Sequence, residues 1–193
     1  MSSDVETRTR ILEAAVRLLE AQRGRSVRMG DIARAAGLSR QAVYLHFASR
    51  AELLAATTLY VDKRLGLEQR LAPSRAAGSG TGRLDAYIEF WGNYLPEIYG
   101  VARALLDAQA NDAAAAAAWN ERMQAMRDGC RAAIAALESD GRLAKRWSTE
   151  EATDFLWTML SVRNWEQLTQ ACGWSTGQYI RRMQAVARRT FQE

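Results

Sequence analysis

The residues with the clearest chemical potential lie at positions 40 to 45. Arg40, Gln41, Tyr44 and Leu45 share one face if this segment is helical, because successive helical residues are about 100° apart. An Arg guanidinium can form two hydrogen bonds with guanine O6 and N7, and a Gln carboxamide can do the same with adenine N6 and N7. A phenol suits a phosphate, and an apolar side chain suits the methyl group of thymine. This set of side chains is typical of a surface that reads the edges of DNA bases.

Two short helices are predicted to position these side chains. The first runs from Met29 to Ala36 and the second from about Arg40 to Phe47, with a sharp turn at Gly37 and Leu38. Ser39 is placed to cap the second helix through its hydroxyl group. The motif alone leaves an alternative open, because two helices joined by a glycine can also form an ordinary packed hairpin with a polar outer face.

Positive charge is concentrated in the same third of the chain. The first 60 residues contain nine Arg and six acidic residues, which gives this segment +3 of the chain's net charge of +4. Such a bias is expected of a phosphate-binding domain, and a solvated basic surface would have the same composition.

Residues 9–54 resemble the N-terminal domain of the TetR family of transcriptional regulators. The segments that carry the resemblance are RILEAAVRLLEAQ, DIARAAGLSRQAVYLHF and ASRAELL. In that family the second helix of the motif enters the major groove and flanking residues hold phosphates. The resemblance therefore implies base contacts by Arg40, Gln41, Tyr44 and Leu45, and phosphate contacts by Arg28, Ser39, His46 and Arg50. At position 50 the family frequently has Lys, and Arg keeps the charge while permitting a forked contact.

The composition of the whole chain predicts an all-α fold. Of the 193 residues 48% are hydrophobic and 25% are charged, only two are Pro, and strand-like alternation is nearly absent. We expect about nine helices in two domains, a three-helix helix-turn-helix DNA-binding domain over residues 1–50 and a helical regulatory and dimerisation domain over residues 51–193. A capping box at Ser49 and Glu52 is expected to start a connecting helix. The segments expected beyond the first domain are this helix over 49–71, a loop over 73–82, and helices over 83–95, 96–109, 111–139, 148–170 and 175–191.

The last two expected helices carry apolar stripes at helical spacing. Phe155 and Met159 belong to one stripe, and Ile180 and Met183 to the other. Core packing alone would explain either stripe. Because members of the resembled family usually dimerise by pairing their last two major helices, the resemblance implies a homodimer with these four residues in its interface.

Aromatic and Met residues are concentrated in the middle of the chain. Six Trp occur in the sequence, and large rings with pliable Met are what a cavity for a flat or apolar ligand would use. For each residue taken singly, core packing is the simpler interpretation. As a group, the candidate pocket residues are Trp91, Tyr94, Trp119, Met123 and Phe155, and few charges lie among them. We therefore expect a mainly apolar or aromatic small-molecule effector.

Other classes of function find little support in the sequence. The single His lies at the end of the helix-turn-helix motif, and no catalytic, metal-binding or phosphate-cradling motif is present, so we expect neither an enzyme nor a cofactor or metal. Cys130 and Cys172 are far apart and are expected to be buried structural thiols. Without a leader or an apolar run of about 18 residues, a cytoplasmic protein without a membrane span is expected.

A helical protein-protein interaction scaffold that does not read DNA is the alternative, but it leaves Arg40, Gln41 and Tyr44 unexplained. The sequence therefore favours a homodimeric, ligand-responsive transcriptional regulator. A repressor that binds a palindromic operator and is released by its effector is the form we expect, and activation stays open.

Overall fold

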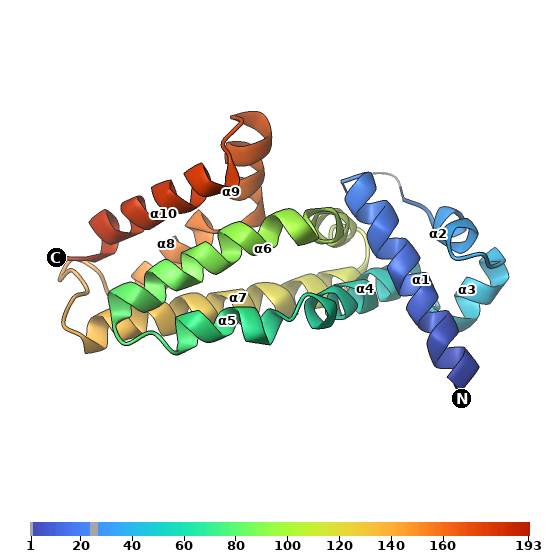
Figure 1. The fold of residues 1–193 in the computed structure, drawn as a ribbon, viewed down its shortest axis with the longest axis horizontal. Coiled ribbons are helices and arrows are strands. Elements are labelled where there is room, and N and C mark those ends of the chain that lie inside the picture. The colour runs from blue at the N-terminus through green and yellow to red at the C-terminus, as the bar shows by residue number, and fades with distance from the viewer. Residues whose placement is uncertain (1, 24–26) are drawn as a thin grey trace. The chain divides into compact units, whose positions relative to one another are not determined.

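The computed structural model describes residues 2–23 and 27–193, and within these ranges the chain forms α-helices and one π-helical segment but no β-strand (Figure 1). This confirms the all-α expectation. The elements are α1 (Ser2–Ala21), α2 (Met29–Ala35), α3 (Arg40–His46), α4 (Arg50–Arg64), α5 (Leu67–Arg75), α6 (Gly80–Ala108), α7 (Ala113–Ser139), α8 (Thr149–Met159), α9 (Val162–Glu166), η1 (Gln167–Ala171) and α10 (Thr176–Phe191).

These elements form two compact units, each made of two stretches of sequence. The first unit combines the chain up to Gly66 with residues 97–121, and the second combines residues 67–96 with 122–193. Helices α6 and α7 each contribute to both units.

The first unit is built on α1, which presents one apolar face. Ile11, Ala15 and Leu19 recur at intervals of four residues and are fully buried, as an amphipathic helix requires. The same core contains apolar residues of α2, α3 and α4 and reaches Val101 and Leu105 of α6. The helix-turn-helix segment and the end of α6 thus share one apolar core.

The connecting helix expected over 49–71 is two helices. Ser49 caps α4 as expected, because its Oγ accepts a hydrogen bond of 3.1 Å from the Glu52 N–H. The Glu52 carboxylate, however, accepts from the N–H of Ala48 at 2.7 Å, one residue before the position that a capping box uses. Gly66 then adopts φ +66°, a left-handed conformation that favours glycine, and separates α4 from α5.

The two Pro residues lie inside helices, contrary to expectation. Pro73 belongs to α5, so the loop expected over 73–82 is limited to residues 76–79. Pro96 lies in the interior of α6, so the helices expected over 83–95 and 96–109 are one continuous helix. A proline inside a helix lacks an N–H and crowds the carbonyl four residues earlier, so α6 has a local weakness there.

The helix expected over 148–170 is interrupted after α8. A capping box starts α8, since Ser148 Oγ accepts from the Glu151 N–H at 3.2 Å and the Glu151 carboxylate accepts from the Ser148 N–H at 3.1 Å. Helix α8 ends at Met159, and Ser161 Oγ caps α9 by accepting from the Asn164 N–H at 3.3 Å. Helix α9 then passes directly into the π-helical segment η1.

The second unit has a core of its own. Its fully buried side chains come from α6, α7, α8 and α10, and they include Leu84, Ile88, Cys130, Ile134, Leu137, Leu156, Tyr179 and Phe191. Ion pairs join the same helices at the surface. Arg188 of α10 pairs with Asp85 of α6 at 2.6 Å, and Arg131 of α7 pairs with Glu150 of α8 at 2.7 Å.

Candidate functional site

Helix α3 presents a mixed polar and apolar face to solvent. Arg40, Gln41, Tyr44 and Leu45 are all exposed, and Leu45 keeps 83% of its surface accessible. The opposite side is anchored by Val43, which is fully buried. The four residues that the resemblance implies as base contacts therefore lie together on one free surface.

The turn before α3 fixes the orientation of that surface. Gly37 adopts φ +67° directly after α2, and the N–H of Leu38 donates to the carbonyl of Ala33 at 2.9 Å. Ser39 then caps α3, since its Oγ accepts from the Ala42 N–H at 3.1 Å. The turn and the cap lie where the sequence predicts them.

Arg40 and Tyr44 interact with each other on this surface. The Arg40 guanidinium donates to the Tyr44 hydroxyl at 3.4 Å and lies 5.5 Å from the centre of the Tyr44 ring. These residues are one helical turn apart, which is the spacing at which side chains on a helix meet. The pair holds both side chains over the face of α3, and the long hydrogen bond leaves the guanidinium able to exchange partners.

The four candidate phosphate contacts have different surroundings. Arg28 and Ser39 are exposed. His46 keeps only 14% of its side chain accessible and lies with Nδ1 3.4 Å from an oxygen of Asp4. Arg50 is half-buried and donates from Nε to the carbonyl of Val27 at 3.1 Å, so it holds the segment before α2. Arg28 is thus open to a partner, whereas Ser39 is exposed but caps α3, and His46 and Arg50 also have contacts within the domain.

Several Arg residues of the basic N-terminal segment hold the domain together, a role that sequence reasoning did not identify. Arg10 and Arg17 of α1 donate to the carbonyls of Ala36 and Ala35 at the end of α2, each at 3.2 Å. Cations are favourable at a helix C-terminus because the last carbonyls carry partial negative charge. Arg8 lies 4.6 Å from the centre of the Phe47 ring. The excess of positive charge in the first 60 residues is therefore only partly available to a nucleic acid.

The second unit contains an aromatic cluster on α6. Tyr87, Phe90, Trp91 and Tyr94 pack against one another, with ring centroids 5.1–6.3 Å apart, and Arg70 lies 5.1 Å from the centre of the Tyr94 ring. Two of the candidate pocket residues, Trp91 and Tyr94, belong to this cluster, where Tyr94 is buried and Trp91 is half-buried.

The cluster packs on α7 through Tyr87. The Tyr87 hydroxyl donates to the carbonyl of Met126 at 2.7 Å, and burial raises the pKa of Tyr87 well above its ordinary value. Cys130 is fully buried on α7, and burial raises the pKa of its thiol to about 12. Cys172 is exposed, so the expectation of two buried thiols is correct for Cys130 and wrong for Cys172.

The other candidate pocket residues lie elsewhere. Trp119 belongs to the first unit and packs against its core. Met123 is half-buried on α7. Phe155 is 43% exposed and stacks on Trp147 with ring centroids 5.6 Å apart, in a group that includes Phe191. Phe155 thus belongs to a separate aromatic group at the end of α10.

The candidate dimer residues differ in how far they are exposed. Met159 and Met183 are each only 9% exposed in the single chain, and Ile180 is half-buried and faces Gly92 of α6. Phe155 is exposed, and the sequence pattern did not single out Val186 of α10, which is 43% exposed. The apolar surface that a partner could reach on α8 and α10 is therefore at Phe155 and Val186.

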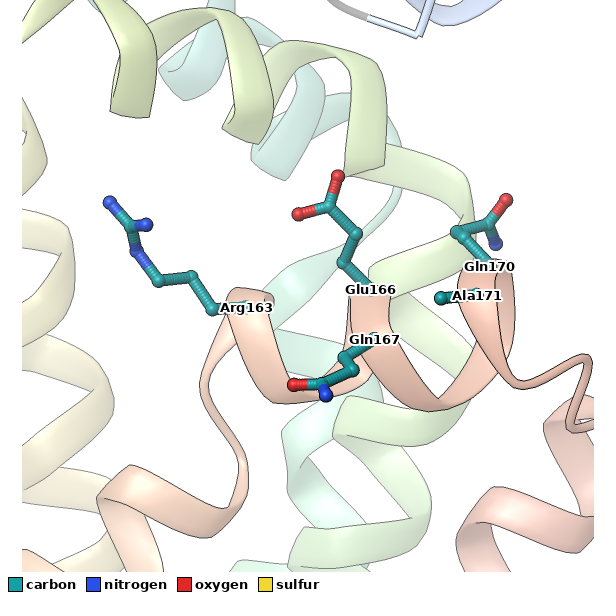
Figure 2. Close-up of a pocket in the computed structure, with 5 residues that line it drawn as sticks. All are labelled: Arg163, Glu166, Gln167, Gln170 and Ala171. Atoms are coloured by element: carbon teal, nitrogen blue, oxygen red, sulfur yellow. The ribbon is translucent and has the colours of Figure 1, made fainter.

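A hollow that the sequence did not predict lies along α9 and η1. Its volume is about 550 Å³, and Figure 2 shows the residues that line it, Arg163, Glu166, Gln167, Gln170 and Ala171. All five come from one continuous helical stretch and most are exposed. A hollow lined by a single helix does not enclose a ligand, and we assign it no function.

Comparisons with known proteins identify the first unit's helix-turn-helix. The family described as bacterial regulatory proteins, tetR family, matches residues 11–57. Over 48 residues the chain is 46% identical to AcrR, an HTH-type transcriptional regulator of Shigella flexneri. Residues 11–57 therefore match the helix-turn-helix segment of the TetR family. The aligned part covers 25% of this chain and 22% of AcrR, so the chain matches about a fifth of that relative.

Solved structures extend the likeness to the whole TetR fold. A transcriptional regulator from Saccharomonospora viridis, in complex with choline, aligns with a TM-score of 0.82 at 20% identity over 98% of this chain and 99% of that chain. NalD of Pseudomonas aeruginosa, the secondary repressor of the MexAB-OprM multidrug efflux pump, aligns with a TM-score of 0.68 at 21% identity over 99% and 98%. These similarities establish the fold, an N-terminal helix-turn-helix domain with a C-terminal helical domain.

The match of residues 11–57 to the TetR family also bears on the functions that the sequence did not support. TetR-family regulators are DNA-binding transcription factors without enzymatic activity, which agrees with the expectation from sequence. Across residues 2–23 and 27–193, no group of three or more His, Cys, Asp or Glu side chains is arranged to bind a metal. No helix in these ranges is long and apolar enough to cross a membrane.

Proposed function

We propose that the protein is a transcriptional repressor that binds a palindromic DNA operator as a homodimer and acts in the cytoplasm. The observation that carries the proposal is the free face of α3, where Arg40, Gln41, Tyr44 and Leu45 are exposed together. Donors and acceptors of this kind distinguish base pairs in the major groove, while a helical scaffold that does not read DNA would not need them. Arg28, Ser39, His46 and Arg50 are proposed to contact phosphates at the edges of this face.

Selection of bound duplexes from a random pool tests this function directly. The proposal expects an enriched inverted repeat whose half-sites are about one helical turn apart, because two reading helices of a two-fold dimer meet successive major grooves. Affinity for the selected duplex should fall steeply with salt, because phosphate contacts release counterions. Recovery of no preferred sequence, together with binding that is insensitive to salt, would leave the scaffold as the better interpretation.

The proposed dimer uses the exposed apolar residues of α8 and α10. Phe155 and Val186 are accessible, and the two helices have opposite charge, since α8 contains three acidic and no basic residues whereas α10 contains four Arg and no acidic residue. A two-fold axis that pairs α8 with the partner's α10 would match these charges. Met159, Ile180 and Met183 would then support the interface from beneath.

Light scattering tests the dimer. The native protein should have twice the mass of the 21.5 kDa chain at micromolar concentration, and Phe155→Asp should lower that mass because an unpaired carboxylate would have to be buried. Leu59→Asp is the matched control, because Leu59 is 60% exposed on α4 in the first unit and lies outside the proposed interface. A monomeric native protein would exclude the dimer and the inverted repeat with it.

The proposed effector is a mainly apolar or aromatic small molecule bound in the C-terminal domain. The aromatic cluster of α6 supports this, with Trp91 and Tyr94 as the candidate contacts. A bound effector would favour a spacing of the two reading helices that no longer matches successive major grooves, and the repressor would be released.

Choline is a specific probe for the effector site. The Saccharomonospora viridis neighbour was solved with choline, and the Tyr94 ring of this chain already has a cation, Arg70, at 5.1 Å. Quaternary ammonium groups bind to aromatic faces. Choline and a neutral aromatic compound such as indole should be compared by tryptophan emission, melting temperature and affinity for the selected duplex, which should change over one concentration range. Weaker DNA binding supports an effector that releases the protein from DNA, whereas stronger binding supports an effector that promotes DNA binding.

A further inference from the structure

The backbones of α1 and α6 are in direct contact at Gly100, within the first unit. A Cβ atom placed on Gly100 would lie 2.2 Å from the carbonyl oxygen of Leu19 and 2.7 Å from the Cα of Glu20. Both are backbone atoms, so no side-chain movement could make room. Only glycine allows the last turn of α1 to approach α6 this closely.

The carboxylate of Glu20 uses this close approach to bind the backbone of α6. Its Oε2 accepts from the N–H of Gly100 at 3.0 Å and its Oε1 accepts from the N–H of Val101 at 3.1 Å. These two N–H groups lie in the continuous helix α6, one turn after Pro96. The Glu20 carboxylate therefore binds the α6 backbone close to the local weakness that the proline creates.

Glu20 holds this position although its surroundings oppose its charge. Burial raises the pKa of the Glu20 carboxyl above its ordinary value, against the opposing effects of the Gly100 and Val101 N–H groups and of Arg64 on α4. A charge kept in a desolvated position stabilises the fold less than an apolar residue of similar size would. The contribution of the Glu20 carboxylate is instead the direction of its hydrogen bonds. Apolar contacts such as those of Val101 and Leu105 are not directional and allow a helix to slide or rotate, whereas two hydrogen bonds to consecutive N–H groups fix the register of α6 against α1.

We propose that Glu20 is the positioning residue that locks residues 97–121 to α1, so that a displacement of this segment is passed to the DNA-reading helices as a rigid movement. The inference rests on the proposed function, since the response that it transmits is the effect of a ligand on DNA binding. Glu20 couples residues 97–121 to α1, and it contacts neither DNA nor effector.

Amide hydrogen exchange tests the lock without any ligand. Glu20→Gln keeps the shape of the side chain, but its NH₂ group would face one of the two N–H donors, so one hydrogen bond is lost and one donor meets another. Exchange of the amides in residues 98–105 should rise at least about tenfold, while α2 and α3 stay as protected as in the native chain. Glu13→Gln is the matched control, because Glu13 is an exposed residue of the same helix and accepts from the Tyr60 hydroxyl at 3.1 Å, away from α6.

If Glu20→Gln does not fold, Glu20→Met replaces it, because Met has a similar length and brings no polar group into the contact. The same rise in exchange is expected with this variant. Unchanged exchange of residues 98–105 in a folded Glu20 variant would overturn the proposal, since the segment would then be held by apolar packing alone.

A second measurement tests the coupling itself, with the duplex selected from the random pool as the probe. Binding of that duplex should slow exchange in residues 98–105 of the native chain and of Glu13→Gln, and this protection should be lost in the Glu20 variant although the duplex is still bound. Equal protection in all three proteins would refute the coupling. If no duplex binds the native chain at low salt, the proposed function fails, and the exchange measurement without DNA still decides whether Glu20 locks the segment.

Discussion

Replacing Gly100 by Ala is the sharpest test of the contact between α1 and α6. The added Cβ would lie 2.2–2.7 Å from three backbone atoms of Leu19 and Glu20, where ordinary carbon contacts need about 3.5 Å or more. Both helices are anchored in one apolar core, so relief requires them to separate by about 1 Å.

The cost follows from three contributions. Forced overpacking of this kind costs about 1–3 kcal/mol. Separation of the helices also breaks at least one hydrogen bond between the Glu20 carboxylate and the α6 backbone, which contributes about 1.5–3 kcal/mol when one partner is charged. The better helix propensity of Ala returns about 1 kcal/mol. The free energy of unfolding should therefore fall by about 1.5–5 kcal/mol, with a decrease of the melting temperature of about 3–20 °C for a chain of this size.

Gly30→Ala provides the matched control. Gly30 also lies in a helix, α2, but nothing lies within 4 Å of the position that its Cβ would take. This variant should be as stable as the native chain or more stable by up to about 1 kcal/mol. Urea unfolding followed by circular dichroism measures both. If Gly100→Ala proved as stable as Gly30→Ala, the close approach of the two backbones and the lock built on it would be wrong.

Three further outcomes can be measured with single substitutions. Gln41→Ala should weaken binding to the selected duplex by about 1–3 kcal/mol and relax preference at one position of each half-site, and equal affinity of this variant and the native chain for every duplex would contradict the assigned face. Arg50→Ala should instead weaken binding to all duplexes. Arg50→Lys should restore the charge but not the hydrogen bond to Val27. Tyr179→Phe should leave the free energy of unfolding unchanged or raise it by about 1 kcal/mol, because the Tyr179 hydroxyl is buried and has no hydrogen-bond partner among residues 2–23 and 27–193. A clear loss of stability would mean that the hydroxyl has one. Folding raises the pKa of Glu20, so protonation of its carboxyl stabilises the native chain below pH 4.5, the ordinary pKa, and this stabilisation is lost as the pH rises through the raised pKa. The free energy of unfolding of the native chain, relative to that of Glu20→Gln, should therefore fall over that pH range. A relative free energy that rises instead would mean that folding lowers this pKa.

The elements whose signals are local could be predicted from the sequence. Ser39 and Gly37 specify the turn before α3 by cap and backbone chemistry, and the apolar period of α1 and α10 depends only on neighbouring residues. The exposure of Arg40 and Gln41 follows from the same periodicity. For this reason the candidate reading face could be named residue by residue before its geometry was known.

The features that depend on contacts between distant segments could not be predicted. Pro96 reads as a helix start, but α6 continues through it, and Glu20 binds the backbone one turn later from a helix 80 residues earlier in the chain. Gly66 reads as one glycine in a helical pattern, and only its left-handed backbone shows that the connecting helix ends there. Phe155 shares its helical period with core residues but packs on Trp147, so periodicity alone could not place it.

The contrast between the two cysteines makes the molecule ready for selective labelling. Thiol reagents attack the thiolate, and burial with a pKa of about 12 keeps Cys130 protonated and shielded at neutral pH, whereas Cys172 is accessible directly after η1. The sequence contains no third cysteine. A maleimide fluorophore or spin label should therefore attach at one known position of the native chain without any engineered substitution. Because the label would be close to the hollow along α9 and η1, its signal could report whether that surface changes when DNA or a small molecule binds.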